Sequence, residues 1–172
     1  TSTSMTIEGF TINAGTAGRG IVIQNGTSNV TVKNNKIINF TENGLIISNG
    51  NNNSVLNNVI TSTADANAGV YVDNDSKNNL IEGNQISLLS SGSKNLYNIY
   101  FAGNIPKDNS NTINDNLLDG GKISFQQDRG VKGTTTFSNN TIGNDVSPSF
   151  AGIYLNGGSA NILGNTIKDA VR

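Results

Sequence analysis

The sequence predicts an all-β chain wound as a parallel solenoid of about seven coils, with three short parallel sheets. Three observations lead to this fold class: a repeat marked by asparagine, alternating apolar residues around each marker, and a composition rich in uncharged polar residues. A repeat of 20–50 residues is typical of solenoids. We treat residues 1–172 as one solenoid domain and expect it to be part of a longer protein or assembly.

The repeat becomes visible when seven segments are aligned on one position. They are MTIEGFTI (5–12), VTVKNNKI (30–37), NSVLNNVI (53–60), NLIEGNQI (79–86), NTINDNLL (111–118), TTFSNNTI (135–142) and ANILGNTI (160–167). Their marker residues are Phe10, Asn35, Asn58, Asn84, Asn116, Asn140 and Asn165. An apolar residue stands three positions before each marker and another two positions after it, which predicts one strand on either side.

A second set of segments lies between these and supplies the remaining strand of each repeat. It comprises GIVI (20–23), GLII (44–47), GVYV (69–72), NIYF (98–101), KISF (122–125) and GIYL (152–155). Apolar residues alternate in these segments, as in a β-strand. One coil of three short strands cannot bury its own apolar face, but stacked coils can, because each adds a strand to each sheet.

The marker asparagines (Asn35, Asn58, Asn84, Asn116, Asn140 and Asn165) are expected at the corner between two strands. Asparagine tolerates the left-handed backbone conformation that a tight corner requires. Its amide can also bond to the same amide in the coils above and below, forming a ladder. We therefore interpret these residues as structural.

The composition excludes several classes of protein. Hydrophobic residues make up 34% and charged residues 13% of the chain, and 31 residues are Asn. The formal net charge is −1 without a Lys/Arg cluster, so no nucleic acid partner is expected. No apolar run reaches 18 residues, so no membrane insertion is expected. The absence of His and Cys removes the commonest general base, the Ser-His-Asp triad and thiolate metal sites.

The two sets of segments resemble the repeats of right-handed parallel β-helices of the pectate-lyase-like superfamily. They are closest to the repeats of carbohydrate-binding and sugar-hydrolase domains in extracellular proteins, and the resemblance covers about residues 5–168. It implies a right-handed parallel β-helix, an extracellular or cell-surface location, and a polysaccharide lying along the outside of the first sheet. The scaffold itself does not imply an activity.

The outward residues of the first sheet are the first candidates for binding. We expect them to be Val22, Ile46, Tyr71, Tyr100, Ser124 and Tyr154 in successive coils. Tyr71, Tyr100 and Tyr154 would then lie on one outer stripe, with Asn98 nearby as a polar contact for a sugar. Stacked tyrosines are also ordinary strand formers that stabilise their neighbours, so a purely structural role stays open.

Acidic residues after the first-sheet strands are the second group of candidates. Asp73 and Asp75 follow one strand, and Asp128 and Arg129 follow another two coils on. Asp75 and Asp128 are expected to share one position, and Asp73, Asp75 and Asp128 could hold Ca²⁺ through their carboxylates. Lyases of this fold resemble one another in using such carboxylates with a Lys or Arg base. Aspartate is equally common in turns, however, and the Gly-His-Gly and Asp-Pro-His-Asp signatures of related enzymes are absent.

Three functions therefore remain as hypotheses. The first is a non-catalytic extracellular module that gives a rigid scaffold and binds glycan or a protein partner through the tyrosine stripe, without a required cofactor. The second is a polysaccharide lyase or hydrolase that uses Asp and Arg or Lys with Ca²⁺. The third is a surface-layer or fibre subunit that associates with copies of itself, end to end or laterally, through uncapped coils.

Overall fold

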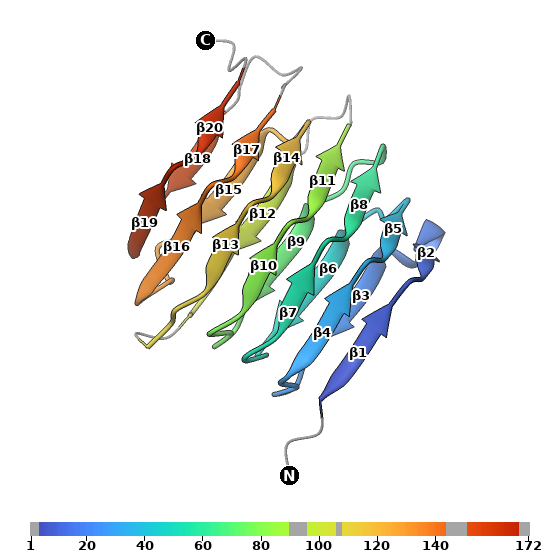
Figure 1. Ribbon diagram of the computed structural model, residues 1–172, viewed down its shortest axis with the longest axis horizontal. Coiled ribbons are helices and arrows are strands. Elements are labelled where there is room, and N and C mark those ends of the chain that lie inside the picture. The colour runs from blue at the N-terminus through green and yellow to red at the C-terminus, as the bar shows by residue number, and fades with distance from the viewer. Residues whose placement is uncertain (1–3, 90–95, 106–107, 144–150, 169–172) are drawn as a thin grey trace.

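A computed structural model describes residues 4–89, 96–105, 108–143 and 151–168 (Figure 1). The described chain contains one short 3₁₀ helix, η1 (Gly15–Ala17), and otherwise strands joined by turns. The strands are β1 (Met5–Glu8), β2 (Thr11–Asn13), β3 (Arg19–Ile23), β4 (Val30–Lys33), β5 (Lys36–Ile38), β6 (Asn43–Ser48), β7 (Ser54–Leu56), β8 (Val59–Ser62), β9 (Ala68–Asp73), β10 (Leu80–Glu82), β11 (Gln85–Leu88), β12 (Tyr97–Phe101), β13 (Thr112–Asn114), β14 (Leu117–Asp119), β15 (Ile123–Gln127), β16 (Thr134–Ser138), β17 (Thr141–Ile142), β18 (Ala151–Leu155), β19 (Ser159–Leu163) and β20 (Thr166–Ile167).

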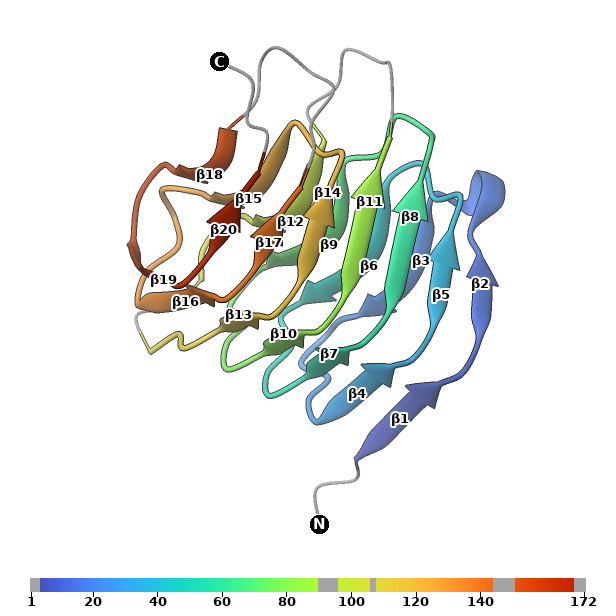
Figure 2. The same cartoon turned by 45° about the horizontal axis from the view of Figure 1, so that its top comes forward.

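The strands form three parallel sheets around one core, as predicted (Figure 2). The first sheet has the order β3-β6-β9-β12-β15-β18, the second β1-β4-β7-β10-β13-β16-β19, and the third β2-β5-β8-β11-β14-β17-β20. Because the first sheet has six strands and the others have seven, the chain completes about six turns rather than seven. Each turn lies beside the next, and strands β1 and β2 lie at the opposite end of the stack from β19 and β20 (Figure 1).

The core consists of aligned apolar side chains that point inward from all three sheets. The predicted positions on either side of the marker are fully buried in the central coils, as Val55 and Ile60 illustrate. Phe101, Phe125 and Phe137 fill the C-terminal half, with ring centroids 5.8 Å apart for Phe101–Phe125 and 4.7 Å for Phe125–Phe137. Equivalent side chains of adjacent coils therefore pack on one another, and each coil gains apolar contacts that it lacks alone.

The predicted asparagine ladder is present along the corner between the second and third sheets. The Nδ2 group of each marker donates to Oδ1 of the marker in the next coil, over 3.1 Å from Asn35 to Asn58 and 3.0 Å from Asn58 to Asn84. The same bonds link Asn84, Asn116, Asn140 and Asn165 over 2.9–3.0 Å. Each Oδ1 also accepts from the preceding marker's backbone N–H, so the amides satisfy buried polar groups of the bend.

The marker asparagine was expected to adopt the left-handed conformation at the corner. In the structure the residue before the marker adopts it instead. Positive φ angles occur at Gly9, Asn34, Asn57, Gly83, Asp115, Asn139 and Gly164, with values from 52° to 76°. None of the markers has a positive φ in the described chain. The marker side chain must point inward to reach its neighbours, so the bend falls one residue earlier. Only Gly, Asn and Asp occupy that position, which are the residues that tolerate this conformation best.

A second, shorter asparagine ladder lies at the corner before the second sheet and was not predicted. Asn53 N–H donates to Asn79 Oδ1 over 2.9 Å, and Asn79 N–H donates to Asn111 Oδ1 over 2.8 Å. All three side chains are buried. They stand five residues before Asn58, Asn84 and Asn116, so the alignment on the markers also places these three asparagines in one column. The second ladder lies where the strands of the second sheet begin, and the marker ladder lies where they end.

Candidate functional site

The outer face of the first sheet carries the predicted aromatic residues, with one shift of register. The aligned row is Val22, Ile46, Tyr71, Tyr100, Gln126 and Tyr154. The prediction of Ser124 in this row was wrong, because Phe125 pairs with Ile99 and not with Phe101. Ser124 is buried at the inward corner position that glycine occupies in other coils, and Gln126 stands between Tyr100 and Tyr154. Tyr154, 45% exposed, is therefore separate from the other tyrosines.

Three tyrosines do gather on this face, but the third is Tyr97. The rings of Tyr71 and Tyr100 meet edge to face with centroids 5.4 Å apart. The rings of Tyr97 and Tyr100 are tilted by 35° with centroids 4.5 Å apart. Tyr71 and Tyr100 are half-buried neighbours in adjacent strands, whereas Tyr97 is largely buried. We call Tyr71, Tyr97 and Tyr100 the tyrosine cluster.

Asp128 holds the central ring of the tyrosine cluster. Tyr100 Oη donates to Asp128 Oδ2 over 2.6 Å, and Gln126 Nε2 donates to Asp128 Oδ1 over 2.8 Å. Burial and the bond to Asp128 raise the pKa of Tyr100 far above its usual value. Burial, followed by the charge of Asp73 and a hydrogen bond to it, raises the pKa of Tyr71. Both hydroxyls are therefore neutral at physiological pH.

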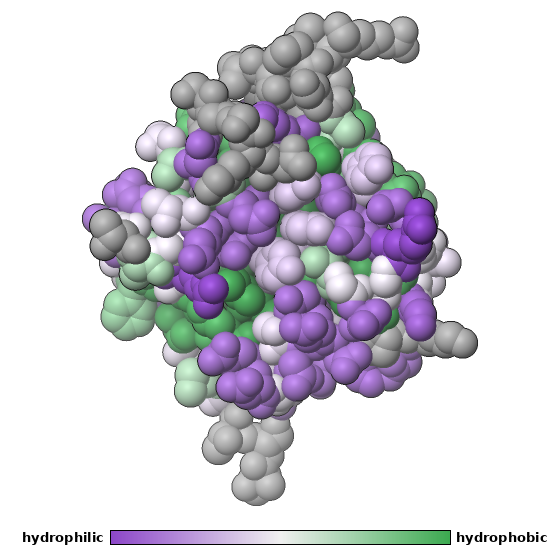
Figure 3. Space-filling model, turned by 180° about the vertical axis from the view of Figure 1, so that it is seen from behind, coloured by the Kyte–Doolittle hydropathy of each residue, from purple (hydrophilic) through white to green (hydrophobic). Residues whose placement is uncertain are grey.

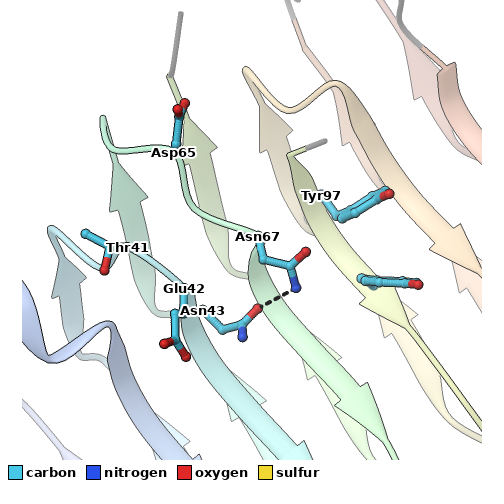
Figure 4. A pocket seen from close by; sticks show the side chains of 7 residues that line it. Thr41, Glu42, Asn43, Asp65, Asn67 and Tyr97 are labelled. Carbon is cyan, nitrogen blue, oxygen red and sulfur yellow. Dashed lines mark hydrogen bonds between the residues drawn. The ribbon is translucent and has the colours of Figure 1, made fainter. Parts of the chain in front are cut away.

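Two clefts run along this face beside the tyrosine cluster. The larger has a volume of about 560 Å³ and is lined by Thr41, Glu42, Asn43, Asp65, Asn67, Tyr97 and Tyr100 (Figure 4). The smaller has a volume of about 340 Å³ and is lined by Arg19, Val22, Gln24, Asn43, Ile46, Ser48, Asn67, Tyr71 and Asp73. Both clefts are lined by Asn43 and Asn67, so they adjoin one another, and we call the two together the groove. Figure 3, seen from behind, shows an apolar area bordered by polar side chains on this side of the molecule.

A pair of amides lies where the two clefts meet. Asn67 Nδ2 donates to Asn43 Oδ1 over 3.1 Å, across two adjacent coils (Figure 4). Asn43 is 8% exposed, yet its Nδ2 donates no hydrogen bond within the described residues, and Asn67 Oδ1 accepts none there. The pair therefore offers one donor group and one acceptor to a molecule in the groove. Sequence reasoning missed both residues, because neither belongs to the aligned columns.

Comparison with known proteins bears on the fold. The chain matches a family described as "Right handed beta helix region" over residues 1–167. The chain belongs to this family. Comparisons with curated proteins and with solved structures returned no match.

The right-handed beta helix does not bring the predicted metal residues together. Val72 aligns with Phe101 and Phe101 with Gln127, so Asp73, and not Asp75 as predicted, shares a row with Asp128 two coils away. Asp75 lies exposed in the following turn with φ 58°, and Arg129 is exposed beyond Asp128. Within the described residues, no group of three or more acidic side chains is arranged to hold a metal ion. Asp128 bonds Tyr100 instead.

Asn98 does not reach the groove of this right-handed beta helix, which corrects its prediction as a ligand contact. It is fully buried, and its Nδ2 donates to Ile86 O over 3.1 Å and Asp119 O over 2.8 Å. In the preceding coil this position is Gly69, where a Cβ would lie 2.4 Å from Ile86 Cγ2. The position thus points into the core, and Asn98 satisfies carbonyl groups there.

Among the described residues, no helix has the length and hydrophobicity needed to cross a lipid bilayer.

Proposed function

We propose that this right-handed beta helix is a non-catalytic extracellular module that binds a glycan in the groove. The observation that carries the proposal is the pair of adjoining clefts, which the tyrosine cluster lines and which meet at the Asn43–Asn67 amide pair. Sugar rings present apolar faces that suit aromatic and aliphatic side chains, and hydroxyls that suit amides. The apolar floor formed by Val22 and Ile46 extends the surface available to a second sugar unit.

Preorganisation supports this proposal. Side chains that are already held in place lose little conformational entropy when a ligand binds. Tyr100 is fixed by Asp128, and its ring in turn contacts Tyr71 and Tyr97. The groove residues come from strands and their immediate flanks, on a scaffold that two asparagine ladders stiffen. A binding role needs no further chemistry from these groups.

The test is glycan-array screening of the wild-type chain followed by calorimetry on the best ligand. Tyr100→Ala combined with Asn67→Ala should abolish binding while far-UV circular dichroism is retained, since neither change removes a side chain of the apolar core. Tyr154→Ala, outside the groove, is the matched control and should bind normally. If no glycan binds at millimolar concentration, or if the groove variant binds as tightly as the control, the glycan proposal is wrong.

A second candidate function is end-to-end assembly with copies of the same chain. The observation favouring it is the exposure of apolar side chains on both end coils, with Met5 and Phe10 each 59% exposed at one end and Ile162 39% and Ile167 48% exposed at the other. Ile162 and Ile167 continue the rows that begin with Ile7 and Ile12, so stacked copies would extend the same core. Sheet edges pair readily when they are not covered.

A further inference from the structure

Four asparagines of the chain are followed directly by glycine. The dipeptides are Asn25-Gly26, Asn43-Gly44, Asn49-Gly50 and Asn156-Gly157. Such a dipeptide can lose ammonia spontaneously, because the backbone nitrogen of glycine has no side chain beside it to block its attack on the asparagine amide. The attack requires that this nitrogen and the asparagine side chain turn towards each other. The fold therefore decides which of the four dipeptides reacts.

Three of the dipeptides are held in conformations that oppose the reaction. The N–H of Gly26 donates to Asn49 O over 2.7 Å, and the N–H of Gly50 donates to Ser76 Oγ over 3.2 Å. Asn43 is 8% exposed and lies in β6, which pairs with a neighbouring strand on each side. In each case the glycine nitrogen could attack only after hydrogen bonds or packing had been broken.

The dipeptide Asn156-Gly157 lies in a different environment, directly after β18. Asn156 is exposed, and its side chain makes no hydrogen bond within the described residues. The peptide group that joins the two residues also makes none there, through either its C=O or its N–H. Gln127 bonds only the flanking groups, because its O accepts from Asn156 N–H over 2.8 Å and its Nε2 donates to Gly157 O over 2.9 Å. The reactive peptide group itself is thus unrestrained by hydrogen bonds in this part of the structure.

Close packing against the preceding coil requires glycine at this position. Gly157 has a φ of 150°, and a Cβ built on it would lie 2.7 Å from Arg129 Cα. The next residue, Gly158, has a φ of 75°, and its Cβ would lie 2.3 Å from Val131 O. A side chain that would shield the Gly157 nitrogen therefore does not fit. The packing that closes this coil keeps the dipeptide in its reactive form.

We infer that Asn156 is a site of spontaneous deamidation. The Gly157 nitrogen gives its proton to solvent base and forms a bond to Asn156 Cγ, and Nδ2 takes up solvent protons and leaves as ammonia. Water then opens the resulting cyclic imide at either of its carbonyl carbons, which leaves aspartate or isoaspartate. The net reaction consumes one water and releases one ammonia. It needs no oxidant, reductant or enzyme.

The modification places a new carboxylate beside Asp128. Leu155 pairs with Gln127, so the residues that follow them, Asn156 and Asp128, stand side by side in adjacent coils. Paired strands lie about 4.8 Å apart, and like charges at that distance repel. The isoaspartate product also adds a carbon atom to the backbone where Gly157 already packs closely on Arg129. Both products should therefore loosen the end of β18.

Peptide mapping of the aged, folded protein tests the inference. The protein is kept in mildly alkaline buffer, and mass spectrometry follows the conversion of each Asn-Gly dipeptide from amide to acid. Asn156 should convert more than about fivefold faster than Asn25, since the nitrogen at Asn25 must first lose a backbone hydrogen bond. Asn25, exposed and also followed by glycine, is the matched internal control. Asn156→Gln should remove the main acidic species on ion exchange, and Asn156→Asp should elute with one product of the aged wild type.

The same measurement on the unfolded chain separates the fold from the local sequence. In guanidinium chloride all four dipeptides should convert at similar rates, because the hydrogen bonds and packing that protect three of them are gone. A preference for Asn156 that persists in the unfolded chain would show that the sequence sets it, which overturns the structural argument. Conversion of Asn25 or Asn49 before Asn156 in the folded protein overturns the assignment of the site. So does an unchanged Asn156 after a time in which the unfolded chain has reacted.

Discussion

Tyr100 and Asp128 are joined across adjacent coils by a 2.6 Å hydrogen bond from the tyrosine hydroxyl to Oδ2 of the carboxylate. Asp128 also accepts from Gln126, which lies beside Tyr100 in the neighbouring strand. The bond connects an acidic residue, expected to hold a metal ion, to an aromatic residue, expected to hold a sugar. Its consequence is a fixed ring at the centre of the tyrosine cluster.

Removal of the Tyr100 hydroxyl should weaken both stability and binding. Tyr100→Phe keeps the ring but leaves Asp128 Oδ2 without its donor, so the free energy of unfolding should fall by about 1 kcal/mol. Glycan affinity should also fall, because the ring is no longer held in place. Urea denaturation and calorimetry measure the two effects. Tyr154→Phe, on an exposed residue without a hydrogen bond in the described structure, is the control and should change neither.

Alkaline pH should destabilise the fold through the same residue. Burial and the bond to Asp128 raise the pKa of Tyr100 above its unfolded value of about 10. The associated stability is therefore fully present below about pH 10 and is lost as pH rises from there towards the folded pKa. The urea midpoint of the wild type should fall above pH 10, and that of Tyr100→Phe should fall less. Parallel curves for the two proteins would show that Tyr100 does not contribute.

The fold could be predicted because each coil repeats the same contacts with the next. A marker such as Asn58 bonds its counterpart Asn84, and apolar residues at fixed distances from each marker meet one another in the core. Residues that share a column of the alignment therefore contact one another from coil to coil along the solenoid. The backbone conformation within the corner does not follow from that column, because Asn57 and Asn58 are both asparagine and only their geometry separates their roles.

The site could be predicted only where it follows the repeat. Tyr71 and Tyr100 occupy equivalent positions and were identified. Tyr97 was missed because its equivalent in the preceding coil is Ala68, so no column marks it as aromatic. Gln126 was missed because the segment around it lacks the glycine found in four of the other first-sheet segments, and KISF (122–125) was therefore aligned out of register. The Asn43–Asn67 pair joins different positions of two coils, and only the structure places them together.

Interruption of the asparagine ladder should be costly. Asn84→Ala removes the Oδ1 acceptor of the Asn58 N–H and Nδ2 groups and the donor that reaches Val55 O, all of them buried. The free energy of unfolding should fall by about 1–3 kcal/mol, since buried polar groups lose their partners. Thermal and urea denaturation would measure this. Asn114→Ala, at a half-buried side chain outside the ladder, should cost clearly less, and equal losses would contradict the ladder's importance.

The corner conformation gives a separate test at Asn57, which has φ 53° and no side-chain hydrogen bond in the described structure. Asn57→Gly should be tolerated, because glycine adopts this conformation without strain. Asn57→Ala should lower the free energy of unfolding by about 1 kcal/mol more than Asn57→Gly, because a Cβ disfavours left-handed geometry. Urea denaturation of both variants decides the matter, and a more stable alanine variant would contradict the assigned backbone angle.

Association through the end coils should depend on the apolar residues that they expose. If copies stack, Ile167 of one copy packs in the row of Ile12 of the next, and mass measured by light scattering should rise with protein concentration. Ile167→Lys places a charge in that contact and should return the protein to a monomer. Leu117→Lys, on the side of the third sheet where Leu117 is 41% exposed, is the matched control and should still associate. A wild-type monomer at high concentration would contradict end-to-end stacking, whereas loss of association in Leu117→Lys alone would indicate lateral contacts instead.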